Sequence, residues 1–260
     1  MKILLYLHTA LVFSIIFFGC EEVNPKKQIV DITPAFQTEK KYKKIISDST
    51  NKLIDKIENL ELEFTVWGCA CPQWIMTEDN NNKDSTKNFF SRHFYLEEEN
   101  KNLAIPIYFD AFRHRIKVQG KFYEREDYPQ GTIEQEEQMP KAKVFQYSKI
   151  EVIDNPNFKP KTKVQTLILG YNAIACTCAQ WSEKKYSTNE NKKTYYWLEP
   201  ANSKLIQADK LYNGLNFPIE IKVTGQIISE NGFPKREISK VGQDEAGKVF
   251  RYSKIEILKK

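Results

Sequence analysis

The chain has 260 residues, with 39 lysine and arginine residues against 34 aspartate and glutamate residues and a formal net charge of +5. So mild a positive excess argues against a nucleic-acid-binding protein, which usually carries a larger and clustered excess. Charged residues make up 28% and aromatic residues 13% of the chain, a composition that suits folded, soluble domains with apolar cores.

Residues 1–20 differ in character from the rest of the chain. Lys2 is the only charged residue before an apolar run from Ile3 to Phe18. This run is shorter than the roughly 20 apolar residues that a bilayer-spanning helix needs, and it is typical of the hydrophobic region of a secretory signal peptide. We therefore interpret residues 1–19 as a signal peptide, with an uncleaved N-terminal anchor helix as the alternative.

The segment Phe17-Phe18-Gly19-Cys20 resembles the lipobox of bacterial lipoproteins, although two phenylalanines replace the usual leucine and small residue. The resemblance implies cleavage before Cys20, lipidation of this cysteine and a membrane tether for the chain that follows. The acidic residues at 21–22 resemble the surface-export signal of some Gram-negative lineages, and a solvated linker is the alternative. We expect an outer-membrane lipoprotein of the cell envelope, exposed on the surface if this signal acts.

Residues 20–38 are expected to form a tether, and residues 39–60 an amphipathic helix with Thr38 as its N-cap. The apolar residues of this segment fall near helical spacing among many charged residues. They are Tyr42, Ile45, Ile46, Leu53, Ile54, Ile57 and Leu60. We expect the helix to pack its apolar stripe on the domain that follows. A membrane-surface helix is the alternative, because four lysines lie between residues 40 and 44.

The rest of the chain is a tandem repeat. From residue 112 onward the two copies align without a net gap at an offset of 105 positions. The matched residues include Phe112 with Phe217, Ile116 with Ile221, Val118 with Val223, Gly120 with Gly225, Pro129 with Pro234, Phe145 with Phe250 and Tyr147 with Tyr252. Residues 94–97 correspond to residues 196–199. A repeat of about 100 residues is too long for a solenoid unit and fits a small domain.

Both copies show the alternation of apolar and polar side chains that half-buried strands require. Residues 60–66 alternate in this way, as do residues 116–122 and 219–227, which predicts strands with one buried face. Gly120 and Gly225 fall inside such strands. A glycine in a strand interior predicts a bulge or a sharp bend of the sheet.

Each copy has the predicted order strand, strand, strand, short helix, strand, strand, with one helical turn expected at residues 208–212. This order, with a glycine in the fourth strand, resembles the OB-fold, a five-stranded Greek-key barrel. The resemblance implies an all-β protein with an N-terminal helix and two OB-like barrels, at residues 61–153 and 163–258, joined by a linker at residues 154–162. Another small barrel or a β-sandwich is the alternative, because OB-folds have no sequence signature.

Four of the five cysteines lie in two copies of the motif Cys-x-Cys-x-Gln-Trp. An extracytoplasmic compartment is usually oxidising, so Cys69, Cys71, Cys176 and Cys178 are disulfide candidates with three possible connectivities. On a flat strand, the Cα atoms of residues i and i+2 lie about 6.6 Å apart. A bridge within one pair therefore needs a bulge or a turn, whereas bridges between the copies need the two motifs to face each other.

Metal binding is the alternative interpretation of these four cysteines. Thiolates on one face of a strand can hold a soft ion such as Zn²⁺ or Cu(I). No histidine recurs with the motif, since His93 aligns with Tyr195, and this weakens the metal interpretation without excluding it. A redox couple and reduced thiols packed in a core are the two remaining interpretations.

The motif ends in Gln73 and Trp74 in the first copy and in Gln180 and Trp181 in the second. We expect structural roles, with each tryptophan covering a cysteine in a core and each glutamine bonding to backbone at a strand end. The alternative is that these four residues form a ligand platform, because OB-folds bind oligosaccharides and oligonucleotides on the barrel face.

The chain contains no glycine-rich phosphate loop, no Gly-x-Ser-x-Gly elbow and no His-Glu-x-x-His motif. We expect no catalytic residues and no cofactor, and we expect the acidic run at residues 97–99 to lie in a solvated loop. The sequence favours a membrane-tethered, non-catalytic binding or structural module whose partner is an envelope protein or a glycan and not a nucleic acid. The alternative function is an envelope protein that binds zinc or copper through the four motif cysteines.

Overall fold

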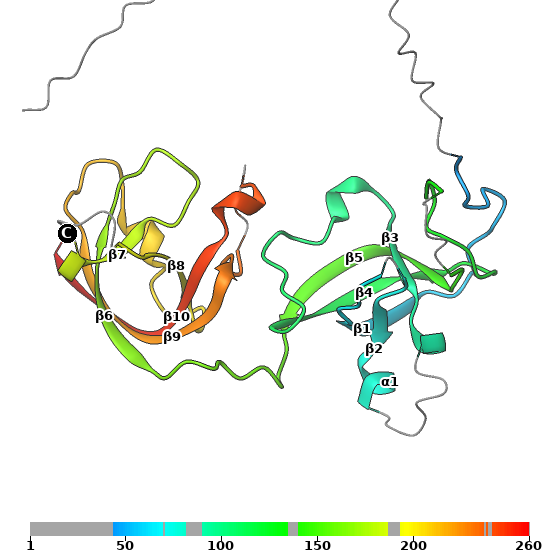
Figure 1. Ribbon diagram of the computed structural model, residues 1–260, viewed down its shortest axis with the longest axis horizontal. Helices are drawn as coiled ribbons and strands as arrows, with labels where there is room; N and C mark the ends of the chain where they lie inside the picture. Colours follow the sequence, from blue (N-terminus) through cyan, green and yellow to red (C-terminus); the bar gives the residue numbers. More distant parts are fainter. Residues whose placement is uncertain are drawn as a thin grey trace, which may run out of the picture. The chain divides into compact units, whose positions relative to one another are not determined.

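The computed structural model describes residues 44–69, 71–81, 90–134, 140–186, 193–236, 238 and 241–259. The expected signal peptide (residues 1–19), Cys20 and the tether (residues 20–38) lie outside these ranges. The described chain is mostly β-strand with a few short helices (Figure 1), which confirms the all-β class. No helix in these ranges is long and apolar enough to cross a bilayer.

The first sheet is built from residues 58–154. Its strands, in the order of the sheet, are β2 (Trp74–Met76), β1 (Glu58–Phe64), β4 (His114–Phe122), β5 (Val144–Asp154) and β3 (Tyr95–Glu98). All neighbouring strands pair antiparallel except β3 and β5, which are parallel. Short helices follow β2 and flank β3: α1 (Thr77–Asn81), η2 (Phe90–Arg92) and η3 (Lys101–Leu103).

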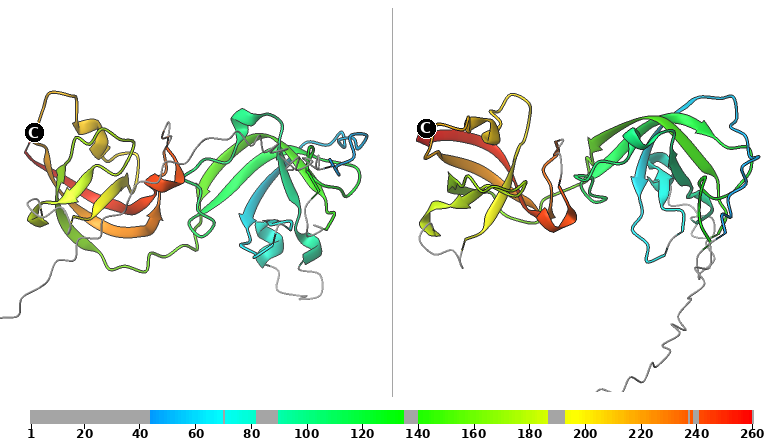
Figure 2. Two further views of the ribbon diagram at one scale, coloured as in Figure 1. Left: turned by 45° about the horizontal axis from the view of Figure 1, so that its top comes forward. Right: turned by 90° about the horizontal axis from the view of Figure 1, so that it is seen from above.

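The second sheet closes on itself as a barrel. Its strands are β6 (Gln165–Tyr171), β7 (Trp181–Glu183), β8 (Tyr195–Pro200), β9 (Glu220–Gly232) and β10 (Gly247–Lys259), in the cyclic order β10-β8-β7-β6-β9. Only β8 and β10 pair parallel. The long strands β9 and β10 run side by side in every view (Figure 2). The short helices are η4 (Lys184–Tyr186), η6 (Ala208–Leu211) and η7 (Gln243–Glu245).

Strand pairings recur between the two sheets. Several residue pairs of the first sheet have counterparts in the second at the offsets of the sequence repeat: Phe64–Trp74 with Tyr171–Trp181, Tyr95–Val144 with Trp197–Val249, and Trp74–Phe94 with Trp181–Tyr196. The last pair is an isolated bridge in the first sheet, whereas it belongs to the β7–β8 ladder in the second. The repeated sequence therefore sets a repeated pairing register.

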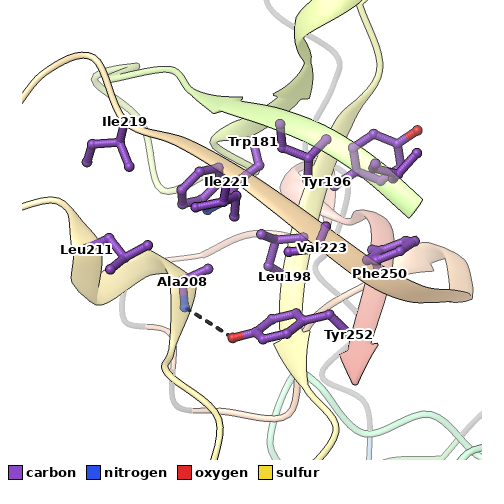
Figure 3. Packing of buried hydrophobic residues seen from close by; sticks show 12 residues of the cluster. Trp181, Tyr196, Leu198, Ala208, Leu211, Ile219, Ile221, Val223, Phe250 and Tyr252 are labelled. Carbon is purple, nitrogen blue, oxygen red and sulfur yellow. Dashed lines mark hydrogen bonds between the residues drawn. The ribbon is translucent and has the colours of Figure 1, made fainter. Parts of the chain in front are cut away.

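Alternating side chains from the strands fill each core. In the second barrel, Ile221 and Val223 of β9 are fully buried while Lys222 between them is exposed, as period two requires. Figure 3 shows Ile221 and Val223 packed with Trp181 and Tyr252. The helical turn expected at residues 208–212 is confirmed as η6, which buries Ala208 and Leu211.

The last strand of each copy, β5 or β10, carries a tyrosine whose hydroxyl group is hydrogen-bonded to backbone. The Tyr252 hydroxyl donates to the carbonyl of Ile206 (2.5 Å). It also accepts from the Ala208 amide (3.2 Å), the bond drawn in Figure 3. In the first sheet the Tyr147 hydroxyl donates to the carbonyl of Leu103 (2.9 Å). Burial raises the pKa of each tyrosine to about 12, so both hydroxyls remain protonated donors near neutral pH.

Gly120 and Gly225 occupy equivalent places, and the predicted irregularity is present at both. The β4–β5 register shifts between Gln119 and Gly120, and the β9–β10 register shifts directly after the Gly225–Tyr252 pair. Neither glycine has a positive φ angle. A Cβ atom at either position would lie within 2.8 Å of backbone atoms of the partner strand. Close approach of that strand, and not the backbone conformation of the glycine, therefore requires glycine here.

The helix expected over residues 39–60 is not found in its described part, residues 44–60; residues 39–43 lie outside the described ranges. Before β1 begins, the segment contains bends and a turn at residues 49–50, and it contacts the β4–β5 connection at several points. The contacts are the bridges Ile45–Ile133 and Leu53–Tyr123 and the hydrogen bonds between Asn51 and the backbone of Arg125. Long-range pairing thus overrides the local helical spacing of the apolar residues.

Candidate functional site

The cysteine motifs lie in the loops that join the first two strands of each repeat. We call residues 65–73 the first motif loop and residues 172–180 the second motif loop. Disulfide bonds join Cys69 to Cys71 and Cys176 to Cys178, each with Cα atoms 5.3 Å apart. The cysteines lie at bends and not on strands, so the expectation that they occupy strand positions is wrong. The bend provides the turn that a disulfide within one pair needs.

The motif glutamine holds each loop through hydrogen bonds to its backbone. The Gln73 side-chain amide donates to the Cys69 carbonyl at 3.0 Å. The Gln180 amide donates to the carbonyls of Cys176 (3.1 Å) and Ile174 (3.2 Å), and its oxygen accepts from the Ile174 amide (2.9 Å). The glutamines are therefore positioned as loop supports, and their polar groups are used within the loop.

The motif tryptophans belong to the two cores. Trp74 is 6% exposed, Trp181 is fully buried, and the Trp181 indole donates to the carboxylate of Asp209 at 2.6 Å. A buried ring cannot serve as a surface on which a ligand stacks. The ligand platform considered for Gln73, Trp74, Gln180 and Trp181 therefore lacks exposed tryptophan rings.

A cavity of about 570 Å³ opens beside the first motif loop. We call it the Trp67 cavity. Its described lining comes from the first motif loop, from residues 90–93 before β3, and from residues 126 and 140–143 in the β4–β5 connection. Three segments that are far apart in the sequence thus converge at one end of the first sheet, with the Cys69–Cys71 disulfide in the wall.

Aromatic side chains form one wall of the Trp67 cavity. The Trp67 ring lies 4.3 Å from the His93 ring and 5.0 Å from the Phe90 ring, measured between centroids. His93 is buried and its Nε2 lies 3.0 Å from the Thr65 hydroxyl, so it backs the wall. Phe90 is 70% exposed, and its ring is therefore within reach of a ligand.

Lysines supply positive charge to the same cavity. Lys141 pairs with the buried carboxylate of Asp127 at 2.9 Å, and this hydrogen bond raises the pKa of Lys141. The Lys143 ammonium lies 5.9 Å from the centre of the Phe122 ring. Because Lys141 is already paired and Glu126 is the single acidic residue of the described lining, Lys143 is the cation that this lining offers to an anionic group.

The second motif loop has a different set of neighbours. Ile174 stands where the first copy has Trp67, and Ala246 stands where it has Lys141. Lys248, the counterpart of Lys143, pairs with Glu230 at 2.8 Å. The two repeats therefore share the loop scaffold and its disulfide but differ in the residues around it.

The described residues offer little for a metal ion. No group of three or more His, Cys, Asp or Glu side chains with a metal-binding arrangement occurs among the described residues. The four motif cysteines are paired as disulfides, and a cysteine binds a metal ion as its thiolate. While they are oxidised, these four residues are therefore not metal donors.

The candidate residues Trp67, Phe90 and Lys141 do not follow from the repeat, because Trp67 and Lys141 are replaced in the second copy. One sequence signal could have pointed to Trp67, a large aromatic residue beside the motif that the other copy lacks.

Comparison with known proteins adds no constraint: no family model, no curated protein and no solved structure matches this chain.

Proposed function

We propose that residues 58–154 and 165–259 are two copies of one OB-like barrel. Numbered within the second copy, the strands follow the cyclic order 1-2-3-5-4, with the parallel pairing between strands three and five and a short helix before strand four. This order and pairing support a five-stranded Greek-key barrel of the OB type. The recurring registers and the two equivalent bulge glycines support a duplication of the whole unit.

The position of the Trp67 cavity carries the functional proposal. OB-folds bind their ligands between the loop that joins strands one and two and the loop that joins strands four and five. In the first repeat these are residues 65–73 and residues 123–143, and both contribute to the cavity. We therefore assign a ligand-binding, non-catalytic role to the first repeat, with the second repeat as its structural companion.

The chemistry of the cavity favours an oligosaccharide that carries acidic groups. The exposed ring of Phe90 and the partly exposed ring of Trp67 offer flat apolar faces on which a sugar ring can pack. The ammonium group of Lys143 lies in the same lining and suits a carboxylate on the sugar. A few polar groups among aromatic walls are typical of small-ligand sites.

Replacing Trp67 with alanine should weaken oligosaccharide binding by about tenfold or more, because large aromatic side chains that a ligand covers contribute most of the binding energy. Binding is measured on an array of uronic-acid-containing oligosaccharides with uncharged glucose oligomers beside them. The matched control is Ile174→Ala, the equivalent position of the second repeat, which should bind as the unaltered protein does.

Three results would contradict the assignment. The unaltered protein could bind none of the acidic oligosaccharides, or Trp67→Ala could bind them as tightly as the unaltered protein. Single-stranded DNA, spotted on the same array, could be bound in preference to every sugar. The last result would leave the site in place and change its ligand class, since OB-folds also bind oligonucleotides.

We further propose that this module is a lipoprotein of the outer membrane, tethered through Cys20. The apolar run before Phe17-Phe18-Gly19-Cys20 supports this location, as does the presence of two disulfides, which persist in oxidising compartments. Replacing Cys20 with alanine should move the protein from the membrane fraction into the soluble fraction, because the attached lipid is then lost. Retention at the unaltered level would contradict lipidation, and proteolysis of intact cells would test surface exposure.

A further inference from the structure

The Cys69–Cys71 disulfide contributes little as a staple of the fold. Its two cysteines are two positions apart. The stabilisation that a disulfide gives by restricting the unfolded chain falls as the loop that it closes becomes shorter. A disulfide that closes a loop of three residues therefore stabilises the fold little. Gln73 already fixes the loop by its hydrogen bond to the Cys69 carbonyl. The shape of the loop therefore does not depend on the disulfide alone.

The disulfide is open to attack from the Trp67 cavity. Cys69 is exposed, Cys71 is half-buried, and both line the cavity. Thiol–disulfide exchange needs access for the attacking thiolate and is faster when the departing thiolate is stabilised. A neighbouring cation lowers the pKa of a thiol, and Lys143, which lies in the same lining as the disulfide, is the cation available for this because Lys141 is paired with Asp127.

We propose that Cys69–Cys71 is a thiol-exchange site for an anionic low-molecular-weight thiol that enters the Trp67 cavity. The thiolate sulfur of this thiol attacks Sγ of Cys69, a mixed disulfide forms, and the bond to Cys71 breaks with its electron pair leaving on the Cys71 sulfur. A second molecule of the thiol then attacks the mixed disulfide. Two thiols are thereby oxidised to one disulfide, and Cys69 and Cys71 are reduced to a dithiol.

The second repeat provides an internal comparison, because its disulfide has the same spacing without the same surroundings. Cys176–Cys178 closes a loop of equal length with Cα atoms at the same separation. Its loop is held by more glutamine hydrogen bonds, Ala246 replaces Lys141, and Lys248 is engaged by Glu230. Exchange is therefore selective for the first pair.

The experiment measures both disulfides in the same molecule. Full-length protein is incubated with reduced glutathione, samples are alkylated over time, and mass spectrometry of the digest quantifies free thiols in the two motif peptides. Cys69–Cys71 should open about fivefold faster than Cys176–Cys178, because the cavity concentrates an anionic thiol beside one pair only. The mixed disulfide with glutathione should appear on the Cys69 peptide.

Lys143→Gln tests whether positive charge in the cavity speeds the reaction of an anionic thiol. This lysine makes no ion pair among the described contacts, and its replacement leaves the Lys141–Asp127 pair intact. It should lower the rate ratio between the two disulfides by about twofold with glutathione. With 2-mercaptoethanol, which carries no charge besides its thiolate, the ratio should fall less, because only the departing thiolate then depends on the lysine. Equal or slower opening of Cys69–Cys71 would overturn the proposal. So would an unchanged ratio in Lys143→Gln, which would show that the cavity lysine has no part in the exchange.

Discussion

Replacing Gly225 with alanine should lower the free energy of unfolding by about 2–4 kcal/mol, near the upper end of what overpacking costs. A Cβ atom at this position would overlap the carbonyl oxygen of Arg251 and lie 2.7 Å from the Cα atom of Tyr252. Both atoms belong to the backbone of β10, so no side chain can turn aside to make room. The strand itself must move, and with it the closure of the barrel.

Gly120→Ala should have nearly the same effect, because its Cβ would overlap the carbonyl oxygen of Gln146 and lie 2.7 Å from the Cα atom of Tyr147. Urea unfolding of the two variants measures the loss. Gly170→Ala is the matched control, since this strand glycine has no atom within 4 Å of its Cβ position. It should keep or slightly gain stability through lower entropy of the unfolded chain.

A loss in Gly170→Ala as large as in Gly225→Ala would show that glycine is required in these strands for a reason other than close approach. A loss in only one of Gly120→Ala and Gly225→Ala would separate two positions that the sequence repeat and the strand register treat as equivalent. Either result would rule out close approach of the partner strand as the common reason for the recurring glycine.

The strands could be predicted from the sequence because the same pattern of apolar and polar residues occurs twice in the chain, once in each copy. Alternation alone leaves the boundaries of a strand open, but residues 116–122 and 221–227 align and alternate together. Buried residues such as Ile116 and Ile221 are constrained by a shared geometry, and their pattern therefore persists in both copies.

The segment before β1 could not be predicted in the same way, since it has no second copy to compare. Ile45 and Leu53 fit a helical stripe, yet their backbones pair with residues of the β4–β5 connection. Such pairing depends on the position of a loop that lies about 70 to 90 residues further along the chain. Local spacing contains no information about that loop.

The cysteine loops illustrate a second limit. Spacing on a strand would place the Cα atoms about 6.6 Å apart, and the observed separation is 5.3 Å because the chain bends between β1 and β2 and between β6 and β7. The bend is held by Gln73 and Gln180, whose hydrogen bonds to backbone carbonyls become apparent only in three dimensions.

The candidate site was missed because the repeat directs attention to what the copies share. Trp74 and Trp181 are shared, and both are buried in cores. Trp67 and Lys141 differ from their counterparts Ile174 and Ala246, and they line the cavity. In a chain with two similar copies, shared residues thus point to the scaffold, while differences between the copies point to the position where a binding site can arise.

A further shared residue, Glu199, anchors the loop between the last two strands. It is 4% exposed, and its carboxylate accepts from the Lys235 amide (2.7 Å) and the Arg251 guanidinium (2.6 Å). The equivalent Glu97 accepts from the Gln130 amide (2.6 Å) and the Gln146 side chain (2.7 Å). Glu97 therefore belongs to strand β3 and to a hydrogen-bond network, which corrects the expectation of a solvated loop for this residue; Glu98 and Glu99 of the same run are exposed, and Glu99 lies after the strand.

Replacing Glu199 with glutamine should cost about 2–4 kcal/mol, somewhat less than a fully buried ion pair, because the Arg251 side chain is 23% exposed. The carboxamide has one acceptor oxygen in place of two, so either the Lys235 amide or the Arg251 guanidinium is left without its acceptor. Urea unfolding measures the loss of stability, and amide hydrogen exchange at Lys235 measures the release of the loop.

Arg251→Gln is the matched control, because it creates in the second repeat the pair that Glu97 and Gln146 form in the first. It should cost about 1 kcal/mol, the value of a single charge-assisted hydrogen bond exchanged for a neutral donor, and it should leave exchange at the Lys235 amide slow. If Arg251→Gln is as destabilising as Glu199→Gln, the ion pair and not the carboxylate would hold the loop. The shared glutamate would then lose its role as the common anchor, since Glu97 performs that role with a neutral partner.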